Sequence, residues 1–344
     1  MTRTALVVGA TGQIGHATVR ALAHDGWRVR AAARGTRASH PWPAEWDVEP
    51  VRLDRDDDTQ LAAALGDGVD VVVDTMAMNA GHARQLIRLA DRIGSAVVIS
   101  TAGVYLDDHG RGFGEAGVRF PVPIVETQPT VEPGEGSYPT EKAAAEQELL
   151  AAGSTLPTTL LRAGAIHGPH TTHPREWHFV KRALDGRPVR ILAHGGQSRF
   201  QPIATANLAE LIRLAAARPG SRALNAADPQ APTVREIGAA IHAVLDHRAD
   251  EILIDGPPPS PTVGYTPWSV PEPIVLDMSA AERDLGYRPV VGYLDSLPAT
   301  VAWLVDAARG RDWRTVFPDL ANNYSTDFFD YPAEDAWLAG RSAG

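Results

Sequence analysis

A tyrosine and a lysine in the middle of the chain have the spacing that proton transfer to a carbonyl oxygen requires. Tyr138 and Lys142 are four positions apart at the start of a predicted helix, so both side chains lie on one helical face. A phenol with a pKa of about 10 is a weak acid–base catalyst at neutral pH unless a nearby cation lowers that pKa. Lys142 can supply this cation and can also hydrogen-bond a ribose hydroxyl.

A hydroxyl group at the end of a buried strand adds a third candidate for the catalytic set. Ser100 and Thr101 follow the apolar run 96–99 and lie at the carboxyl end of a predicted strand. A hydroxyl group at this edge can hold a substrate carbonyl oxygen while Tyr138 donates its proton.

A glycine-rich loop near the N-terminus indicates a dinucleotide site. The run 9–15, with sequence GATGQIG, lies between a buried strand and a helix. Gly9 permits a tight turn, Gly12 lets the backbone approach a pyrophosphate, and Gly15 allows close packing of the helix on the strand. The helix N-terminus then offers N–H groups to the phosphates. The predicted cofactor contacts in this loop are Gly9, Thr11, Gly12, Gln13, Ile14 and Gly15.

The end of the second predicted strand distinguishes the two nicotinamide cofactors. An acidic residue there would bind the adenosine ribose hydroxyls, but Ala33 is followed by Arg34, and Arg37 is close behind. An arginine at this position can pair with a 2′-phosphate. We therefore expect NADP(H), with NAD(H) as the alternative.

Two further strand ends supply candidate cofactor contacts. Leu53 and Asp54 end the third predicted strand, where a carboxylate can accept from the adenine amino group. Thr75, Met76 and Ala77 follow the fourth strand, at the carboxyl edge of the sheet where ligands bind. The acidic run 54–58 is otherwise expected to be a solvated loop and a helix start.

Short apolar runs alternate with helical patterns through the first half of the chain, which predicts an α/β protein. Repeated β–α units of this kind form a Rossmann-type, doubly wound parallel sheet. We expect 1–166 to be a dinucleotide-binding domain to which 199–227 return, and 167–198 and 228–344 to be a smaller, irregular C-terminal region that caps the substrate. The expected strands are 4–8, 28–33, 48–53, 70–73, 96–100 and 158–162, and the expected helices in this half are 16–25, 59–65, 80–94 and 140–152.

Composition restricts the partners and the compartment. The net charge of −10 argues against a nucleic-acid partner, and the absence of cysteine excludes disulfides and thiolate metal sites. No signal peptide and no membrane-length apolar run are present, so a cytoplasmic protein without a membrane partner is expected. His167, His170 and His173 recur at a spacing of three in a loop-like segment, but we predict no metal site there.

Taken together, these motifs resemble the extended branch of the short-chain dehydrogenase/reductase superfamily, the NAD-dependent epimerase/dehydratase family. The similarity covers roughly residues 3–306 and rests on the segments 9–15, 100–105 and 138–142. The resemblance implies that Thr101, Tyr138 and Lys142 are catalytic and that the backbone of Ala165 and Ile166 contacts the nicotinamide carboxamide. It also suggests a homodimer.

Departures from the family pattern narrow the expected reaction. Sugar-nucleotide 4,6-dehydratases carry an acidic pair just after the catalytic hydroxyl residue, where this chain has Ala102 and Gly103. We therefore expect an NADPH-dependent reductase of a small-molecule ketone or aldehyde, of the kind found in secondary metabolism. An NAD-dependent nucleotide-sugar epimerase is one alternative. Another is an RNA-binding or non-catalytic protein on the same scaffold. The segments 71–75 and 100–105 also resemble a subgroup of isoflavone-reductase-like proteins that includes chloroplast stem-loop RNA-binding proteins.

Overall fold

The computed structural model describes residues 2–35 and 42–342, which form two compact units. Unit 1 takes in the described parts of Met1–Ile166, Ile203–Asp228 and Leu276–Val291. Unit 2 takes in His167–Pro202, Pro229–Val275 and the described part of Gly292–Gly344.

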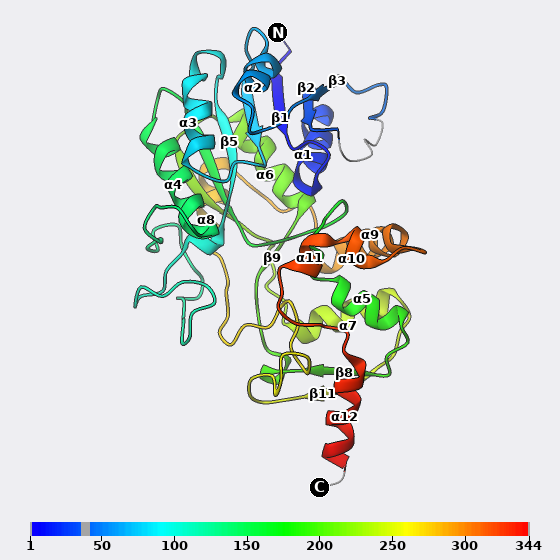
Figure 1. Ribbon diagram of the computed structural model, residues 1–344. Helices are drawn as coiled ribbons and strands as arrows, with labels where there is room; N and C mark the ends of the chain where they lie inside the picture. Colours follow the sequence, from blue (N-terminus) through cyan, green and yellow to red (C-terminus); the bar gives the residue numbers. More distant parts are fainter. Residues whose placement is uncertain (1, 36–41, 343–344) are drawn as a thin grey trace. The chain divides into compact units, whose positions relative to one another are not determined.

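Within the described residues, unit 1 is built on a parallel sheet of seven strands, with the order β10-β6-β5-β4-β1-β2-β3 (Figure 1). The chain runs outward from β1 to β3 and then returns to β4 on the other side of β1. The order therefore reverses between β1 and β4, which is where a doubly wound sheet binds its ligand. The strands are β1 Thr4–Val8, β2 Arg28–Ala33, β3 Val48–Arg52, β4 Val71–Asp74, β5 Ala96–Thr101, β6 Thr158–Ala163 and β10 Arg222–Ala226.

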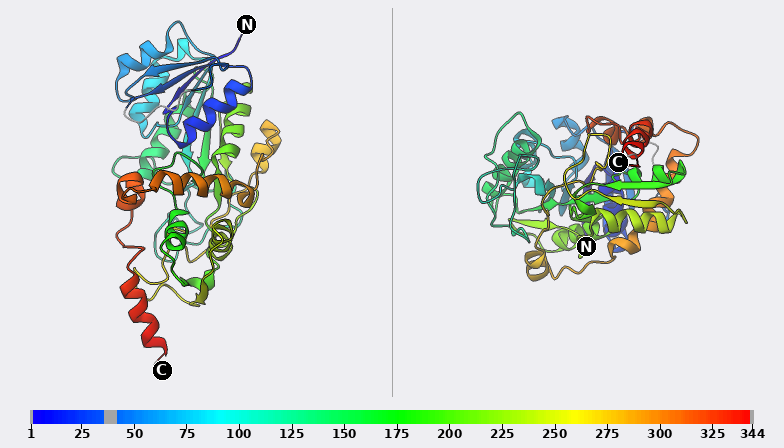
Figure 2. Two further views of the ribbon diagram at one scale, coloured as in Figure 1. Left: turned by 90° about the vertical axis from the view of Figure 1, so that its right-hand side faces the viewer. Right: turned by 90° about the horizontal axis from the view of Figure 1, so that it is seen from below.

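Helices cover both faces of this sheet, which confirms the predicted fold class. Because strand side chains alternate between faces, Ala5 and Val7 join one core cluster, and Leu6 and Val8 join the other. Figure 2 shows the blue helix α1 and the green helix α6 together on one face. The helices on this face are α1 Gln13–His24, α6 Thr205–Ala217 and α8 Ser279–Leu285, and those on the opposite face are α2 Asp58–Leu65, α3 Ala80–Arg88 and α4 Tyr138–Ala151.

Two features of unit 1 differ from the sequence-based expectation. The strand β10 was missed, because the polar side chain of Asn225 interrupts its short apolar pattern. The segment 276–291, expected in the C-terminal region, belongs to unit 1 because α8 packs on α6 and β10. Asn207 of α6, fully buried, accepts from the N–H groups of Val290 and Val291 and donates to Asp228 and to the Val291 carbonyl.

Unit 2 is smaller and more irregular. Its strands β8 Val189–Leu192 and β11 Asp250–Leu253 form a parallel pair. Arg182 and Glu334, both buried, are joined by two hydrogen bonds of 2.8 and 2.7 Å that hold the C-terminal helix in place. Its helices are α5 Trp177–Leu184, α7 Val234–Val244, α9 Tyr293–Ala308, α10 Trp313–Val316, α11 Pro318–Asn322 and α12 Tyr331–Ser342.

The remaining regular elements are short. The strands β7 Ala165–His167 and β9 Pro202–Ala204 pair with each other, and three 3₁₀ turns lie at Ala90–Arg92, Ala102–Val104 and His194–Gly196. Across the described chain, no helix is both long enough and apolar enough to span a bilayer.

Asn207→Ala should lower the free energy of unfolding by roughly 2–3 kcal/mol, because it removes a donor from the buried carboxylate of Asp228 and releases the segment 290–291 from α6. Urea denaturation followed by circular dichroism measures the change. Asn322→Ala, at an exposed position of α11, is the matched control and should have little effect. Equal stability of the two variants would contradict the assigned role of Asn207.

Candidate active site

The glycine loop has the geometry of a phosphate cradle. Gly9 has a φ of +83°, and a Cβ atom added to it would overlap Thr75 at the end of β4. A Cβ atom on Gly15 would overlap the carbonyl oxygen of Gly9 and the backbone of Ala10. Gly12 is the N-cap of α1 and has no side chain to occupy the position of a phosphate group. The residues present therefore fit the pyrophosphate of a dinucleotide.

A cavity of ≈ 220 Å³ adjoins this loop at the carboxyl ends of β1, β2, β3 and β4. Its wall brings together many of the predicted cofactor residues, which come from separate strand ends. The predicted residues that line it are Gly9, Thr11, Gly12, Arg34, Leu53, Asp54 and Met76, and the others are Val8, Ala33, Arg55, Asp56, Met78 and His82.

The other predicted cofactor residues lie outside this lining. Gln13 and Ile14 begin α1 with Gly15. The Thr75 hydroxyl donates to the carbonyl oxygen of Val8 at 2.8 Å, and so joins the end of β4 to β1. The carbonyl oxygen of Ala77 faces Lys142. Ala165 and Ile166 are on β7, and Arg37 falls outside the described residues.

An arginine takes the place of an acidic residue at the end of β2. Arg34 follows Ala33, the last residue of β2, and is exposed while lining the cavity. Its guanidinium group is therefore available to an anionic group on the adenosine half of a dinucleotide.

Sequence reasoning missed Arg55, a buried arginine in the wall of this cavity. Its Nε donates to Asp74 at 2.6 Å and its Nη2 donates to the carbonyl oxygen of His82 at 3.1 Å. Asp74 lies at the end of β4 and is fully buried. The run 54–58 is therefore not simply a solvated loop, and the single arginine within this acidic run was the available signal.

His82 links the loops that follow β3 and β4. Its Nδ1 accepts from the N–H of Met78 at 3.0 Å, so its Nε2 carries the hydrogen and donates to Asp56 at 2.8 Å. These two contacts hold opposite sides of the cavity wall together.

Tyr138 begins α4 and Lys142 lies one turn later, and the structure brings them together. Ser137 caps this helix by accepting from Thr140 N–H. The Lys142 ammonium lies 5.7 Å from the centroid of the Tyr138 ring. Tyr138 is 50 % exposed, whereas Lys142 is only 5 % exposed. The phenol of Tyr138 is thus accessible to a substrate, whereas the Lys142 side chain beside it is shielded from solvent.

Two backbone carbonyl oxygens anchor Lys142. Its Nζ donates to Ala77 at 2.5 Å and to Ile99 at 2.9 Å. Burial lowers the pKa of Lys142 to about 8, and the negative charges of Asp74 and Glu146 oppose that decrease. Burial is the larger of these opposing effects, so the pKa of Lys142 lies below its usual value.

Thr101 is the last residue of β5 and lies two positions after Ile99, whose carbonyl oxygen accepts from Lys142. Its Oγ1 accepts from the N–H of Gly103 at 3.0 Å, which orients the hydroxyl at the end of the strand. Ala102 and Gly103, the positions that are acidic in dehydratases, form the following 3₁₀ turn with Val104 and add no carboxylate.

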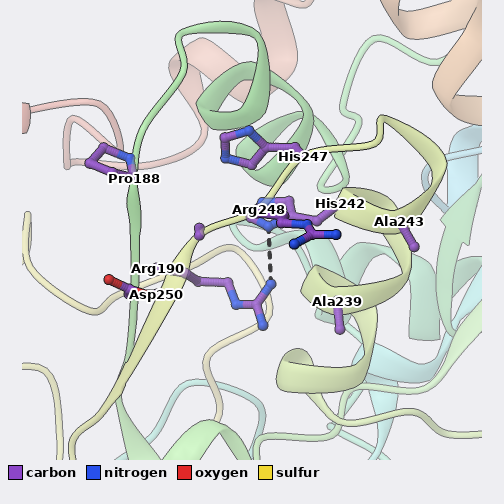
Figure 3. A pocket seen from close by; sticks show the side chains of 9 residues that line it. Pro188, Arg190, Ala239, His242, Ala243, His247, Arg248 and Asp250 are labelled. Carbon is purple, nitrogen blue, oxygen red and sulfur yellow. Dashed lines mark hydrogen bonds between the residues drawn. The ribbon is translucent and has the colours of Figure 1, made fainter.

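Unit 2 contains a larger, open hollow of ≈ 540 Å³ (Figure 3). Arg190 donates to His242 Nδ1 at 3.2 Å and pairs with Glu251 at 2.6 Å, so its charge is balanced locally. The lining provides no hydroxyl group that could protonate a carbonyl, and we therefore place the candidate active site in unit 1. The hollow is lined by Pro188, Arg190, Ala239, His242, Ala243, His247, Arg248, Ala249 and Asp250.

The closely spaced histidines of unit 2 pack against aromatic rings. His167, His170 and His173 have centroid distances of 4.8, 5.5 and 5.6 Å to the rings of Tyr293, Trp303 and Tyr324. Burial lowers the pKa of His173 to about 4. Among residues 2–35 and 42–342, no group of three His, Cys, Asp or Glu side chains could hold a metal ion.

Known proteins share both the sequence pattern and the fold. The model of the "NAD dependent epimerase/dehydratase family" matches residues 5–227. A ceramide reductase of Caulobacter vibrioides is 28 % identical over 166 residues, which are 48 % of this chain and 47 % of that protein. The chain thus spans about half the length of this curated relative.

Solved structures extend the likeness over nearly the whole chain. The epimerase Mth375 of Methanothermobacter thermautotrophicus has a TM-score of 0.71 at 17 % identity and covers 92 % of this chain and 94 % of its own. The Bordetella bronchiseptica enzyme WbmH, solved with NAD⁺, has a TM-score of 0.67 at 19 % identity and covers 88 % and 98 %. These structures share the fold described above.

Gly15→Ala should weaken binding of the nicotinamide dinucleotide by at least about tenfold, because the added methyl group overlaps the Gly9 carbonyl oxygen and displaces the loop. Alanine favours helix over glycine, so helix propensity alone would predict the opposite effect on stability. Titration of NADPH fluorescence measures the affinity. Gly256→Ala, whose Cβ meets nothing within 4 Å, is the control and should bind normally. Normal binding by Gly15→Ala would contradict the proposed cradle.

Proposed function

Because the chain belongs to the NAD-dependent epimerase/dehydratase family, we propose that it is an NADPH-dependent reductase of a ketone or aldehyde. The observation that carries this proposal is the Tyr138–Lys142 pair, in which a buried ammonium lies 5.7 Å from the centre of a half-exposed phenol ring. A cation at that position stabilises the phenolate, so the tyrosine can release a proton and later recover it.

The roles of the chain's own residues follow from their positions. Gly9, Gly12 and the N-terminus of α1 hold the pyrophosphate, and Arg34 pairs with the 2′-phosphate. When bound, the nicotinamide supplies a hydride. Thr101 holds the substrate carbonyl oxygen by its hydroxyl group, and Tyr138 donates a proton from Oη to that oxygen.

Reduction is favoured over elimination and epimerisation by two observations. Ala102 and Gly103 provide no acid for dehydration next to Thr101. The curated relative is named a ceramide reductase, which supports net reduction of a carbonyl group by this chain. Since that match covers about half of each protein, the substrate class of the relative is not part of the proposal.

A nucleotide-sugar epimerase is the second candidate, because structures with this fold include UDP-galactose 4-epimerase, at 19 % identity and a TM-score of 0.64. An epimerase retains its cofactor and shows no net oxidation. Purified protein that carries bound NAD and oxidises no NADPH with any ketone would favour this candidate over the reductase.

Tyr138→Phe should reduce the rate of ketone-dependent NADPH oxidation by about 10²–10⁴-fold, because it removes the proton donor. The rate is measured as loss of NADPH absorbance with a panel of aliphatic, aromatic and lipid ketones. NADPH affinity should stay unchanged. Tyr287→Phe is the matched control, since it removes the same atom from a buried tyrosine whose hydroxyl has no hydrogen-bond partner among the described residues. A similar loss of rate in both variants would contradict the role of Tyr138.

Arg34→Ala should lower NADPH affinity by about tenfold or more while leaving NADH affinity unchanged, because it removes a charged hydrogen-bond partner of the 2′-phosphate. Calorimetric titration with both cofactors gives the two dissociation constants. Arg52→Ala, an exposed arginine outside the cavity lining, is the control. A clear preference of the unmodified protein for NADH would overturn the role assigned to Arg34.

A further inference from the structure

Five buried charged side chains lie at the base of the candidate active site, and Lys142 is one of them. Arg55 donates to Asp74 at 2.6 Å on one side. On the other side Arg162 donates to Glu146, from Nη2 at 2.7 Å and from Nε to both carboxylate oxygens at 3.1 Å. All five are at most 7 % exposed, so water provides little screening of these charges.

The hydrogen bonds of Lys142 favour its protonated form. An ammonium group has three N–H donors, and the carbonyl oxygens of Ala77 and Ile99 accept two of them. The third N–H donor is left for the phenol oxygen of Tyr138 or for a ribose oxygen of the cofactor. Burial opposes this charge, because it penalises an ionised group in a dry site. The site therefore needs a compensating negative charge.

We propose that Asp74 and Glu146 are positioning residues that keep Lys142 protonated beside Tyr138. This inference rests on the catalytic role proposed for that pair. Asp74 lies at the end of β4, and its other oxygen accepts from Met76 N–H at 2.9 Å. Glu146 is one helical turn after Lys142 on α4 and also accepts from the Ser100 hydroxyl at 2.5 Å. Both carboxylates are thus fixed in place, and each is paired with a buried arginine.

The charged groups around Lys142 come from several elements. Asp74 comes from β4, Glu146 from α4, and Arg162 from β6. Arg55 comes from the loop between β3 and α2. The neutral or weakly acidic groups are Ser100 of β5, Tyr138 itself and Tyr105, whose ring centroid is 4.9 Å from the Arg162 guanidinium. The two carboxylates act on Lys142 directly, and each arginine acts through the carboxylate that it pairs with.

The composition of the chain makes the protonation of Lys142 directly measurable. The only lysines in the sequence are Lys142 and Lys181. Lys181 is on α5 in unit 2, where it pairs with Asp185. In a Lys181→Arg background, protein labelled with [6-¹³C]lysine has a single Cε resonance. Its shift against pH reports the protonation of Lys142 in the full chain without cofactor, substrate or activity.

Asp74→Asn and Arg55→Met should move the titration of Lys142 in opposite directions. Asp74→Asn keeps the shape of the side chain but removes its charge, so the pKa of Lys142 should fall by about one unit or more. Arg55→Met leaves Asp74 facing Lys142 without a competing cation, so that pKa should rise. A loss of packing alone would expose the lysine and raise the pKa in both variants. A pKa that is unchanged or raised in Asp74→Asn would therefore overturn the proposal.

A double variant keeps the test decisive if either single variant fails to fold. Removing one member of a buried ion pair is strongly destabilising, whereas removing both leaves no unpaired charge. Arg55→Met/Asp74→Asn should therefore fold. The pKa of Lys142 should still fall in this variant, because the lost carboxylate acts directly on Lys142 and the lost arginine does not. A pKa at or above the unmodified value would refute the proposal.

Reductase activity is a separate readout that distinguishes the two proposals. In Asp74→Asn the alkaline loss of kcat/KM should begin at lower pH, because Lys142 loses its proton earlier. If Lys142 titrates as expected but no ketone is reduced, the proposed function fails and the charge arrangement stands. If ketones are reduced but Asp74→Asn leaves the titration of Lys142 unchanged, the proposed charge arrangement fails and the proposed function stands.

Discussion

The burial of one ammonium group is the constraint on which the candidate active site depends. Lys142 is almost fully buried, so water cannot solvate its ammonium group and protein groups must accept its hydrogen bonds. The carbonyl oxygens that do so come from the end of β5 and from the loop after β4. They converge because β4 and β5 are parallel neighbours and α4 lies against them on one face. The position of Tyr138, one turn earlier on α4, follows from the anchoring of Lys142.

The end of β4 connects the cofactor cradle to the catalytic pair. The residues 74–77 contact Arg55, the glycine loop and Lys142 in turn. Asp74 pairs with Arg55, the Thr75 hydroxyl donates to Val8, and the Ala77 carbonyl accepts from Lys142. A displacement of this short segment would alter both the phosphate cradle and the charge environment of the lysine. Such coupling is expected at the switch point of a doubly wound sheet, where adjacent strand ends supply different parts of one site.

Local patterns were sufficient to predict most of unit 1. The strands β1 and β2 begin and end where the sequence predicted. Strand β1 is buried along most of its length and is apolar after Thr4, whereas β2 carries Arg28 and Arg30 among its apolar residues. The strand β10 was missed, since Asn225 is buried for its hydrogen bonds to Tyr105 and to the Ile124 carbonyl, which are formed only in the folded chain. The return of 276–291 to unit 1 depends in the same way on Asn207, whose partners are more than eighty positions away.

The sequence alone determined the glycine loop, the Tyr138–Lys142 spacing and the α/β class, because each is a short-range pattern set by backbone sterics or helical periodicity. Only the tertiary structure decided the burial and the partners of Lys142 and the wall of the cofactor cavity. Arg55 and Asp74 are 19 positions apart, and Arg162 and Glu146 are 16 apart, on different elements. No periodicity in the sequence joins such residues. Their pairing follows from the parallel strand order and from the cost of leaving a buried charge without a partner.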